Sequence, residues 1–314
     1  MASTPATTRL PAIPARSASA VPAVPAVRRW RTPRGRRRLG GQVLFYLGVL
    51  VVLLIALFPF YWILRTSLES NAEFVQGVGG ANGLIPSHLT LSSYIDDFTQ
   101  LHFLTPLLNS AIVAFGTTVV TIVVASLAGY ALARLPIRGG GAILTFVLLA
   151  GFFPVLAMVG PLFLLYRDLG LLNNIYPLII TYLVYTLPLS TWLLRNFFAQ
   201  IPKELEEAAL VDGASRLQTL RKVVIPVSIP AVFTAGILSF ILAWNDFAFA
   251  LSFLDSPSKF TAPLAIVVFG QSQYETFFNR IDAAVVVITI PIAILVLIAQ
   301  RRIVSGLTAG SLKG

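Results

Sequence analysis

Long apolar runs, separated by short polar segments, fill most of the chain. A membrane-spanning helix needs about 20 apolar residues in succession. Runs of this kind indicate helices, because the strands of a membrane barrel alternate apolar and polar residues. The pattern therefore predicts an all-α integral membrane protein with six transmembrane helices, at residues 43–64, 103–133, 139–166, 169–194, 223–245 and 283–300.

A seventh apolar stretch, residues 260–274, is uncharged but too short to span a bilayer. Pro263 and Gly270 interrupt it, which favours an interfacial or re-entrant segment. Aromatic residues in and just beyond this stretch are expected either to contact an external partner or, as we favour, to form a belt at the membrane interface. They are Phe260, Tyr274, Phe277 and Phe278.

The distribution of basic residues predicts how the helices are oriented in the membrane. With the N-terminus inside and six helices alternating in direction, 19 of the 23 Lys and Arg residues fall in inside segments. The positive-inside rule demands such a bias, so both termini are expected to be cytoplasmic. Residues 1–42 cannot bury enough apolar surface to offset their ordering entropy, which predicts a disordered basic tail. Residues 43–314 are expected to form the transmembrane domain.

Composition narrows the function classes. Hydrophobic residues make up 56% of the chain and charged residues 11%, whereas soluble domains are about 25% charged. The net charge of +10 is concentrated in an arginine cluster before the first span, which favours anionic lipid over nucleic acid as its partner. Cysteine is absent and only two histidines are present, so a metal site would need carboxylates, and none is expected.

Signatures of ATP hydrolysis and of hydrolases are missing. A P-loop needs Gly-Lys-Ser/Thr, and none of the lysines follows a glycine: Lys203, Lys222, Lys259 and Lys313. The patterns G-x-S-x-G and H-E-x-x-H are also absent. The chain is therefore expected not to be an enzyme, and ATP-driven work would need a second polypeptide.

One polar segment, residues 201–226, carries helical signals of its own. Pro202 and the acidic residues after it suit a helix start, Asp212-Gly213 predicts a turn, and Pro226 limits a second short helix. The helix–turn–helix fits either a rigid element that receives a push from another protein or an amphipathic hairpin on lipid headgroups. The expected apolar faces are Leu205, Ala208 and Ala209, and then Leu217, Leu220 and Val224.

This segment contains Glu207-Ala208-Ala209, then Gly213, then Ile225-Pro226. The spacing resembles the EAA loop of ATP-binding-cassette (ABC) importer permeases, although the leucine directly before the proline is missing. The resemblance implies that the loop docks in a groove of an ATPase subunit and couples it to transport. The coupling residues that it implies are Glu207, Ala208, Ala209, Asp212, Gly213, Leu220 and Pro226.

Further matches extend the resemblance over residues 43–314. Trp244-Asn245-Asp246-Phe247 looks like the signature of the sugar permeases of this family, and Asn109-Ser110 and residues 300–314 are similar to theirs. The part from Leu220 onward most resembles maltose/trehalose-type permeases. The resemblance implies a type I importer fold in the bacterial cytoplasmic membrane, with ATP and Mg on a partner ATPase dimer. It also implies a second homologous permease subunit and an external binding protein that delivers sugar.

The substrate path is expected at Trp244, Asn245 and Asp246. The apolar run of residues 223–245 resumes after Asp246 and continues to Leu254, so Asp246 is the only acid inside a predicted span. Ionisable groups at membrane depth usually face a cavity or a partner. Carboxylate, amide and aromatic ring suit the hydroxyls and C–H faces of a sugar, and the acid disfavours an anionic substrate. The alternative is an interhelical hydrogen-bond cluster that fixes the bundle.

Other polar residues are weaker candidates. Arg65 and Glu69 are expected to be solvated, whereas Gly129 and Tyr130, with Ala125 and Ala128, predict close helix packing. Helix capping or contact with water is expected for Asn109, Asn173, Asn174, Gln271 and Gln273.

Three other classes of protein compete with the importer permease. An ion-coupled secondary transporter would use Asp246 as its ion site and predicts inverted repeats, which the sequence does not show convincingly. A membrane-embedded enzyme would need acids or histidines clustered at one membrane face. A structural scaffold would leave the specific loop pattern unexplained.

Overall fold

The computed structural model describes residues 34–70, 74, 88–269 and 278–308, in which every regular element is a helix. The chain divides into two compact units, Met1–Ala56 and Leu57–Gly314. The α-helices are α1 (Arg34–Ser67), α3 (Ser92–Thr99), α4 (Leu104–Arg134), α5 (Gly140–Gly151), α6 (Val155–Asp168), α7 (Tyr176–Thr181), α8 (Leu183–Gln200), α9 (Lys203–Val211), α10 (Arg216–Thr219), α11 (Ile225–Val227), α12 (Ile229–Trp244), α13 (Ala248–Phe253), α14 (Ala262–Phe269) and α15 (Phe278–Thr308). A π-helix, Leu220–Val224, joins α10 to α11, and a short 3₁₀ helix covers Pro257–Lys259.

The first unit contains the N-terminal part of α1. This helix begins at Arg34, upstream of the boundary expected at residue 43. Within this unit every residue from Gly41 to Ala56 is exposed, and this apolar surface must be covered by lipid or by other protein. The rest of the expected tail, residues 1–33, and the last residues, 309–314, lie outside the described residues.

Four helical segments of the described residues are long and apolar enough to cross a membrane: Gly41–Ser67, Leu104–Arg134, Tyr176–Gln200 and Phe278–Gln300. Two bent pairs of helices pass the same test. The described residues therefore hold four candidate spans, or up to six if each bent pair forms one span.

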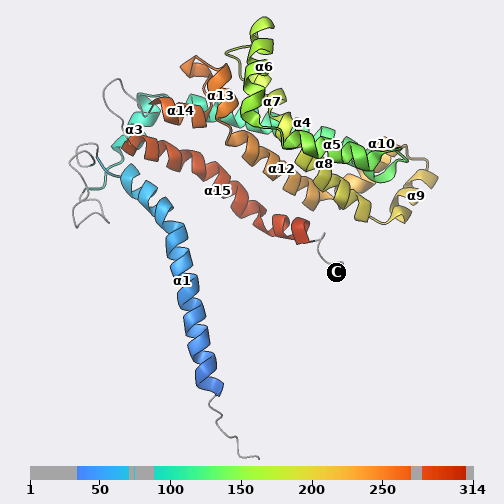
Figure 1. Cartoon of the computed structure of the whole chain (residues 1–314), viewed down its shortest axis with the longest axis horizontal. Helices are drawn as coiled ribbons and strands as arrows, with labels where there is room; N and C mark the ends of the chain where they lie inside the picture. The colour runs from blue at the N-terminus through green and yellow to red at the C-terminus, as the bar shows by residue number, and fades with distance from the viewer. Residues whose placement is uncertain (1–33, 71–73, 75–87, 270–277, 309–314) are drawn as a thin grey trace, which may run out of the picture. The chain divides into compact units, whose positions relative to one another are not determined.

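The expected span at 139–166 is not one straight helix, because α5 and α6 meet at an angle of 86°. The break precedes Pro154, whose ring disfavours helical backbone in the residue before it. A Cβ atom on Gly151 would lie 2.9 Å from Cβ of Pro188, so the glycine lets the end of α5 approach α8 closely. Figure 1 shows α6 turned sharply away from α5.

The expected span at 223–245 also needs correction. The segment Arg216–Val227 and α12 are bent by 85°, so residues 223–227 belong to the preceding loop. Ser228 interrupts the helix, and a proline at the start of α12 suits a new helix because its missing N–H is not needed there. Of the expected span, only α12 remains as one straight helix.

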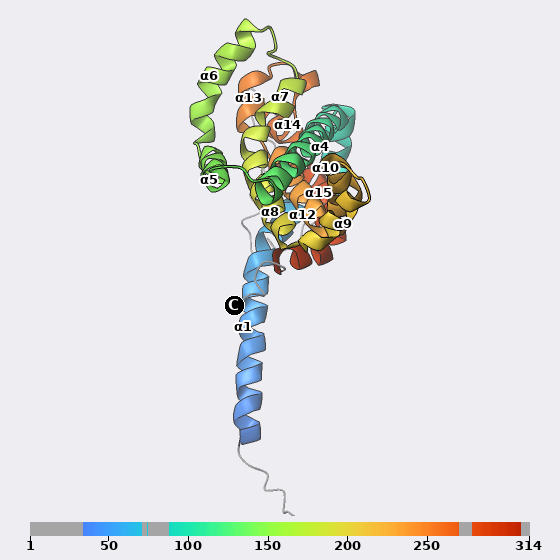
Figure 2. The same cartoon turned by 90° about the vertical axis from the view of Figure 1, so that its right-hand side faces the viewer.

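Helix α4 packs mainly against α8 and α12 in the second unit. A Cβ atom on Gly129 would lie 3.0 Å from the backbone nitrogen of Arg195, which confirms the close approach expected of this part of α4. The hydroxyls of Thr121 and Thr186 lie 2.8 Å apart between α4 and α8. Figure 2, turned by 90°, shows α5 and α6 along the margin of this unit.

The described part of the seventh apolar stretch, residues 260–269, packs into the protein. Helix α14 contributes to the main core, where Leu264 and Ala265 are almost fully buried. Phe260 is 6% exposed, so it forms neither an interface belt nor a free contact surface. Gln271, Gln273, Tyr274 and Phe277, about which expectations were formed, lie outside the described residues.

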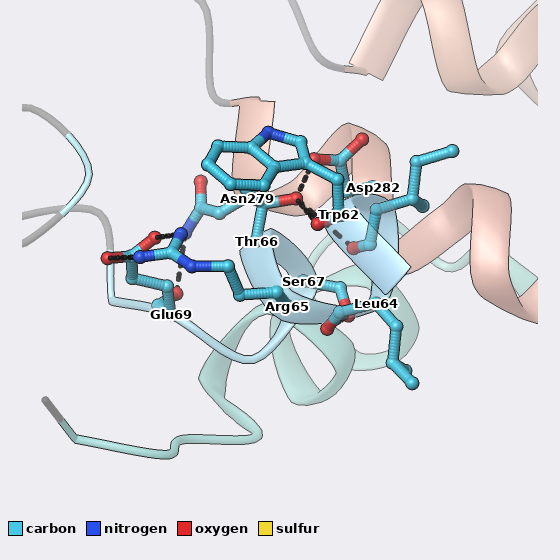
Figure 3. A network of polar contacts seen from close by, with 9 residues as sticks. Trp62, Leu64, Arg65, Thr66, Ser67, Glu69, Asn279 and Asp282 are labelled. Atoms are coloured by element: carbon cyan, nitrogen blue, oxygen red, sulfur yellow. Dashed lines mark hydrogen bonds and ion pairs between the residues drawn. The ribbon is translucent and has the colours of Figure 1, made fainter. Parts of the chain in front are cut away.

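A polar network surrounds the C-terminal end of α1, where solvated side chains were expected. Arg65 and Glu69 are instead buried, and Nη1 of Arg65 lies 2.8 Å from Oε2 of Glu69 (Figure 3). The hydroxyl of Thr66 donates to Asp282 of α15, and the amide of Asn279 donates to the backbone carbonyl of Glu69. These contacts tie the end of α1 to the start of α15.

The pH dependence of stability is predicted to involve Asp97 on α3. Burial raises the pKa of Asp97 from its usual 3.8 to about 7; the charge of Arg280 opposes this rise and that of Asp96 adds to it. Because the folded chain holds this proton more tightly than the unfolded chain does, the stability cost of Asp97 is absent below pH 3.8 and grows until about pH 7. Asp97→Asn should therefore flatten the fall in melting temperature between pH 5 and pH 8.

Asp255→Asn, which alters an exposed acid, is the control and should leave that fall unchanged. The melting temperature is measured in detergent by intrinsic fluorescence. An equal pH dependence in wild type and Asp97→Asn would contradict the assignment.

Candidate functional site

Helix α9 begins after Pro202, and Glu204 and Glu206 lie in its first turn, where the positive end of the helix dipole favours acids. It ends in a Schellman motif. The N–H of Ala214 donates to the carbonyl of Ala209 at 3.0 Å, and the N–H of Gly213 to that of Leu210 at 3.1 Å. Gly213 has φ +84°, which a residue with a side chain adopts only with strain. The expected turn at Asp212-Gly213 is therefore confirmed.

The second helix of the loop departs from expectation. It starts with a capping box, in which Ser215 and Gln218 each accept a hydrogen bond from the other's backbone N–H. The helix then widens into the π-helix, so Leu217 is 64% exposed while Leu220 and Val224 are buried. These three residues do not share the expected face. Nor does Pro226 end the helix, because it lies within α11.

The tip formed by α9, the turn and the start of α10 is exposed. Of the implied coupling residues, Glu207, Ala208, Asp212, Gly213 and Pro226 are exposed, Ala209 is half-buried, and Leu220 is buried in the core. Apolar side chains stand beside them on the surface, most openly Val211, which is 88% exposed. An exposed rigid tip of small and apolar residues is suited to docking against a protein groove.

Glu206, which no local pattern had distinguished from its neighbours, is buried. Its carboxylate lies 2.6 Å from Nε of Arg134 at the end of α4, and it accepts a hydrogen bond of 3.1 Å from the hydroxyl of Tyr130. Arg134 and Tyr130 are distant in sequence, so only the tertiary structure brings these groups together. The loop is thereby fastened to α4.

The second candidate region lies where α12 ends. Asn245, Asp246 and Phe247 form a break before α13, so Asp246 is not inside a continuous helix as the sequence predicted. Oδ2 of Asp246 accepts hydrogen bonds from the hydroxyl of Tyr182 at 2.7 Å and from the backbone N–H of Ala250 at 3.3 Å. Tyr182 itself lies at the junction of α7 and α8. Asp246 therefore bridges two interrupted helices.

Asn245 and Trp244, the other two residues of the expected substrate path, differ in burial. Asn245 is exposed, and its amide donates to the carbonyl of Ile241 at 2.7 Å. Trp244 is 3% exposed and stacks on Phe240, with 5.4 Å between ring centroids. Its indole N–H and the buried hydroxyl of Tyr185 have no hydrogen-bond partner among the described residues. Both donors are buried, Trp244 in the main core and Tyr185 packed against it.

Asparagines expected to cap helices instead hold connections. The amide of Asn109 donates to the carbonyls of Ser258 and Phe260, before α14. Asn173, at φ +57°, accepts a hydrogen bond from the N–H of Ser256. Asn174 accepts one from the N–H of Tyr176, although the N-cap residue of α7 is Ile175.

Comparisons with known proteins agree with the motifs. The profile of a family described as "binding-protein-dependent transport system inner membrane component" matches residues 121–308. The chain is 39% identical over 275 residues to a trehalose/maltose transport system permease protein of Thermococcus litoralis, which covers 87% of this chain and 97% of the relative. It is 41% identical over 279 residues to a trehalose transport system permease protein of Mycobacterium tuberculosis, covering 88% and 100%.

A third relative, a sulfoquinovosyl glycerol transport system permease protein of Agrobacterium fabrum, is 42% identical over 275 residues, covering 87% of this chain and 95% of the relative. Among solved structures, a bacterial ABC transporter involved in the import of the acidic polysaccharide alginate superposes with a TM-score of 0.71. That match has 28% identity and covers 86% of this chain and 98% of the other. The chain therefore belongs to the family of inner membrane components of binding-protein-dependent transport systems.

Proposed function

We propose that the chain is a membrane-spanning permease subunit of an ABC importer that takes up a neutral disaccharide or oligosaccharide. The observation that carries the proposal is the exposed α9–α10 tip, whose Glu207-Ala208-Ala209 and Gly213 resemble a loop that docks on an ATPase. With no P-loop of its own, the chain would draw on ATP and Mg bound by a partner ATPase dimer. Relatives named for trehalose and maltose transport support a sugar as cargo.

In the proposed assembly, this chain spans the bacterial cytoplasmic membrane six times, each bent helix pair counting as one span. Both termini and residues 201–226 face the cytoplasm, because this arrangement places most basic residues inside. Residues 1–42 form a basic tail and residues 43–314 the permease domain. A second homologous permease subunit completes the pore, and an external binding protein supplies the sugar. The comparisons give no support to an ion-coupled transporter.

We place the substrate path beside Trp244, Asn245 and Asp246. Donors at the indole N–H of Trp244 and the hydroxyl of Tyr185 suit the oxygen atoms of a sugar. The carboxylate of Asp246 disfavours an anionic cargo in the same place. In competition assays, trehalose or maltose should therefore reduce uptake more than an acidic sugar does.

The first test is affinity purification of the tagged chain from its native host in mild detergent, followed by mass spectrometry. An ATPase with a P-loop and a second permease are expected to co-elute. The purified complex should take up sugar into proteoliposomes only when ATP, Mg and the binding protein are all present. A monodisperse chain without an ATPase, active with an ion gradient alone, would overturn the proposal.

Gly213→Leu is predicted to uncouple the transporter. The backbone of Gly213 is left-handed, so a side chain adds about 1–2 kcal/mol of strain to the turn and shifts the α9 tip. ATP-driven uptake should fall about tenfold, the change that about 1.4 kcal/mol produces. Gly139→Leu is the matched control, because Gly139 has φ +76° and equally open surroundings away from the tip.

Both glycine variants should reach the membrane in wild-type amounts, as measured by immunoblotting of membrane fractions. Equal uptake by the two variants would show that the shape of the α9 tip does not matter for coupling.

Tyr182→Phe is predicted to destabilise the protein. It removes a hydrogen bond to the Asp246 carboxylate, and losing one partner of a buried charged group costs about 1–3 kcal/mol. The melting temperature in detergent should fall, whereas Tyr176→Phe, the same change at an exposed tyrosine of α7, should leave it unchanged. If Tyr182→Phe instead raised the sugar concentration for half-maximal uptake at an unchanged melting temperature, Asp246 would be a direct sugar ligand.

A further inference from the structure

An ion pair joins α4 to α9. Arg134, the last residue of α4, and Glu206 of α9 form an ion pair of 2.6 Å whose side chains are 5% and 9% exposed. Within Lys203–Val211, Glu206 is the only buried residue. Helix α9 also packs against α10 and the π-helix. Most of its side chains other than Glu206 are exposed and can meet a partner.

Neighbouring contacts limit the freedom of this ion pair. The second carboxylate oxygen of Glu206 accepts the hydroxyl of Tyr130, one turn earlier on α4. Nη2 of Arg134 donates to the carbonyl of Ile201 at 2.5 Å, and Ile201 caps the C-terminal end of α8. The guanidinium therefore joins the ends of α8 and α4 to the start of α9. A positive charge there is also favoured by the helix dipole of α8.

Such a junction resists separation. Parting the two charges would leave each of them desolvated and unpaired, which costs far more than sliding one apolar surface over another. A displacement of α9 would therefore move the end of α4 with it. Helix α4 is itself fastened to α8 at Thr121 and Gly129, so the motion reaches the core of the membrane domain.

We propose that the Glu206–Arg134 ion pair, braced by Tyr130, is the joint that transmits motion of α9 to α4. The inference rests on the proposed ATP-driven function, in which an ATPase moves the α9 tip. Glu206 and Arg134 are positioning residues, because they face the interior of this chain and leave docking to the exposed residues of the tip. Breaking the joint should leave the ATPase bound and separate its cycle from sugar movement.

The test uses the assembled importer with Glu206→Gln, which removes the charge and keeps an acceptor for Tyr130. Glu204→Gln is the matched control, since Glu204 is an exposed acid of the same helical turn. The Glu206→Gln complex should retain its ATPase subunit. The amount of sugar imported per ATP hydrolysed should fall at least about tenfold, within the range of measured couplings between linked sites. Glu204→Gln should match wild type.

A second variant distinguishes a role of this contact in transmitting motion from a role in folding alone. The chain has no cysteine, so Arg134→Cys combined with Glu206→Cys provides a unique pair of thiols in this subunit. A short, reducible bis-methanethiosulfonate should bridge the pair and restore import, and reductant should abolish import again. A structural role alone would not give this reversible rescue.

Three results would contradict the proposal that this ion pair transmits motion. The first is a wild-type amount of sugar imported per ATP by Glu206→Gln, and the second is loss of the ATPase subunit from that variant. The third is absence of import by the double variant when mass spectrometry shows that the bridge has formed. If the proposed importer function itself were wrong, the wild-type complex would show no ATP-dependent import, which distinguishes that outcome from failure of the ion-pair proposal.

Discussion

Polar groups in apolar surroundings must find partners within the protein, and this constraint fixes the points where the helices of this chain are interrupted. Asn109 supplies donors to the connection before α14, Asp246 accepts the hydroxyl of Tyr182 where α7 meets α8, and Arg134 binds the carbonyl that ends α8. In each case the partner is distant in sequence. The interruptions are therefore rigid parts of the fold, and the residues that stabilise them also surround both candidate sites.

Hydropathy predicted where apolar helices lie but not where they bend. The two bends occur near Pro154 and Pro230, yet Pro59, Pro188 and Pro291 lie inside continuous helices. Proline alone therefore does not locate a bend, because neighbouring helices decide whether the lost backbone bond is tolerated. Such neighbours depend on tertiary packing, which the linear pattern of apolar residues does not contain.

In the loop of residues 201–226, some features likewise depend on nearby residues and others on residues distant in sequence. The helix start after Pro202 and the left-handed turn at Gly213 depend on nearby residues, so the sequence predicted them correctly. The burial of Glu206 depends on Arg134, and adjacent acids look alike without that partner. Arg65, a charged residue expected at the surface, was misplaced for the same reason. The resemblance to a family located the loop, and only the structure distinguished its buried acid from its exposed ones.

Helix α4 connects the two candidate sites. One end of it is paired with α9 through Arg134, and its middle packs against α8. Tyr182, which binds Asp246, lies at the start of α8.

The hydrogen bonds at Asp246 bear on whether ATP or an ion gradient drives transport. One oxygen of this carboxylate accepts both the tyrosine hydroxyl and a backbone N–H, so a cation that entered would have to displace contacts on which two helix junctions depend. The α9 tip has no such restraint on its outer face. This contrast favours energy input at the tip over ion binding at Asp246.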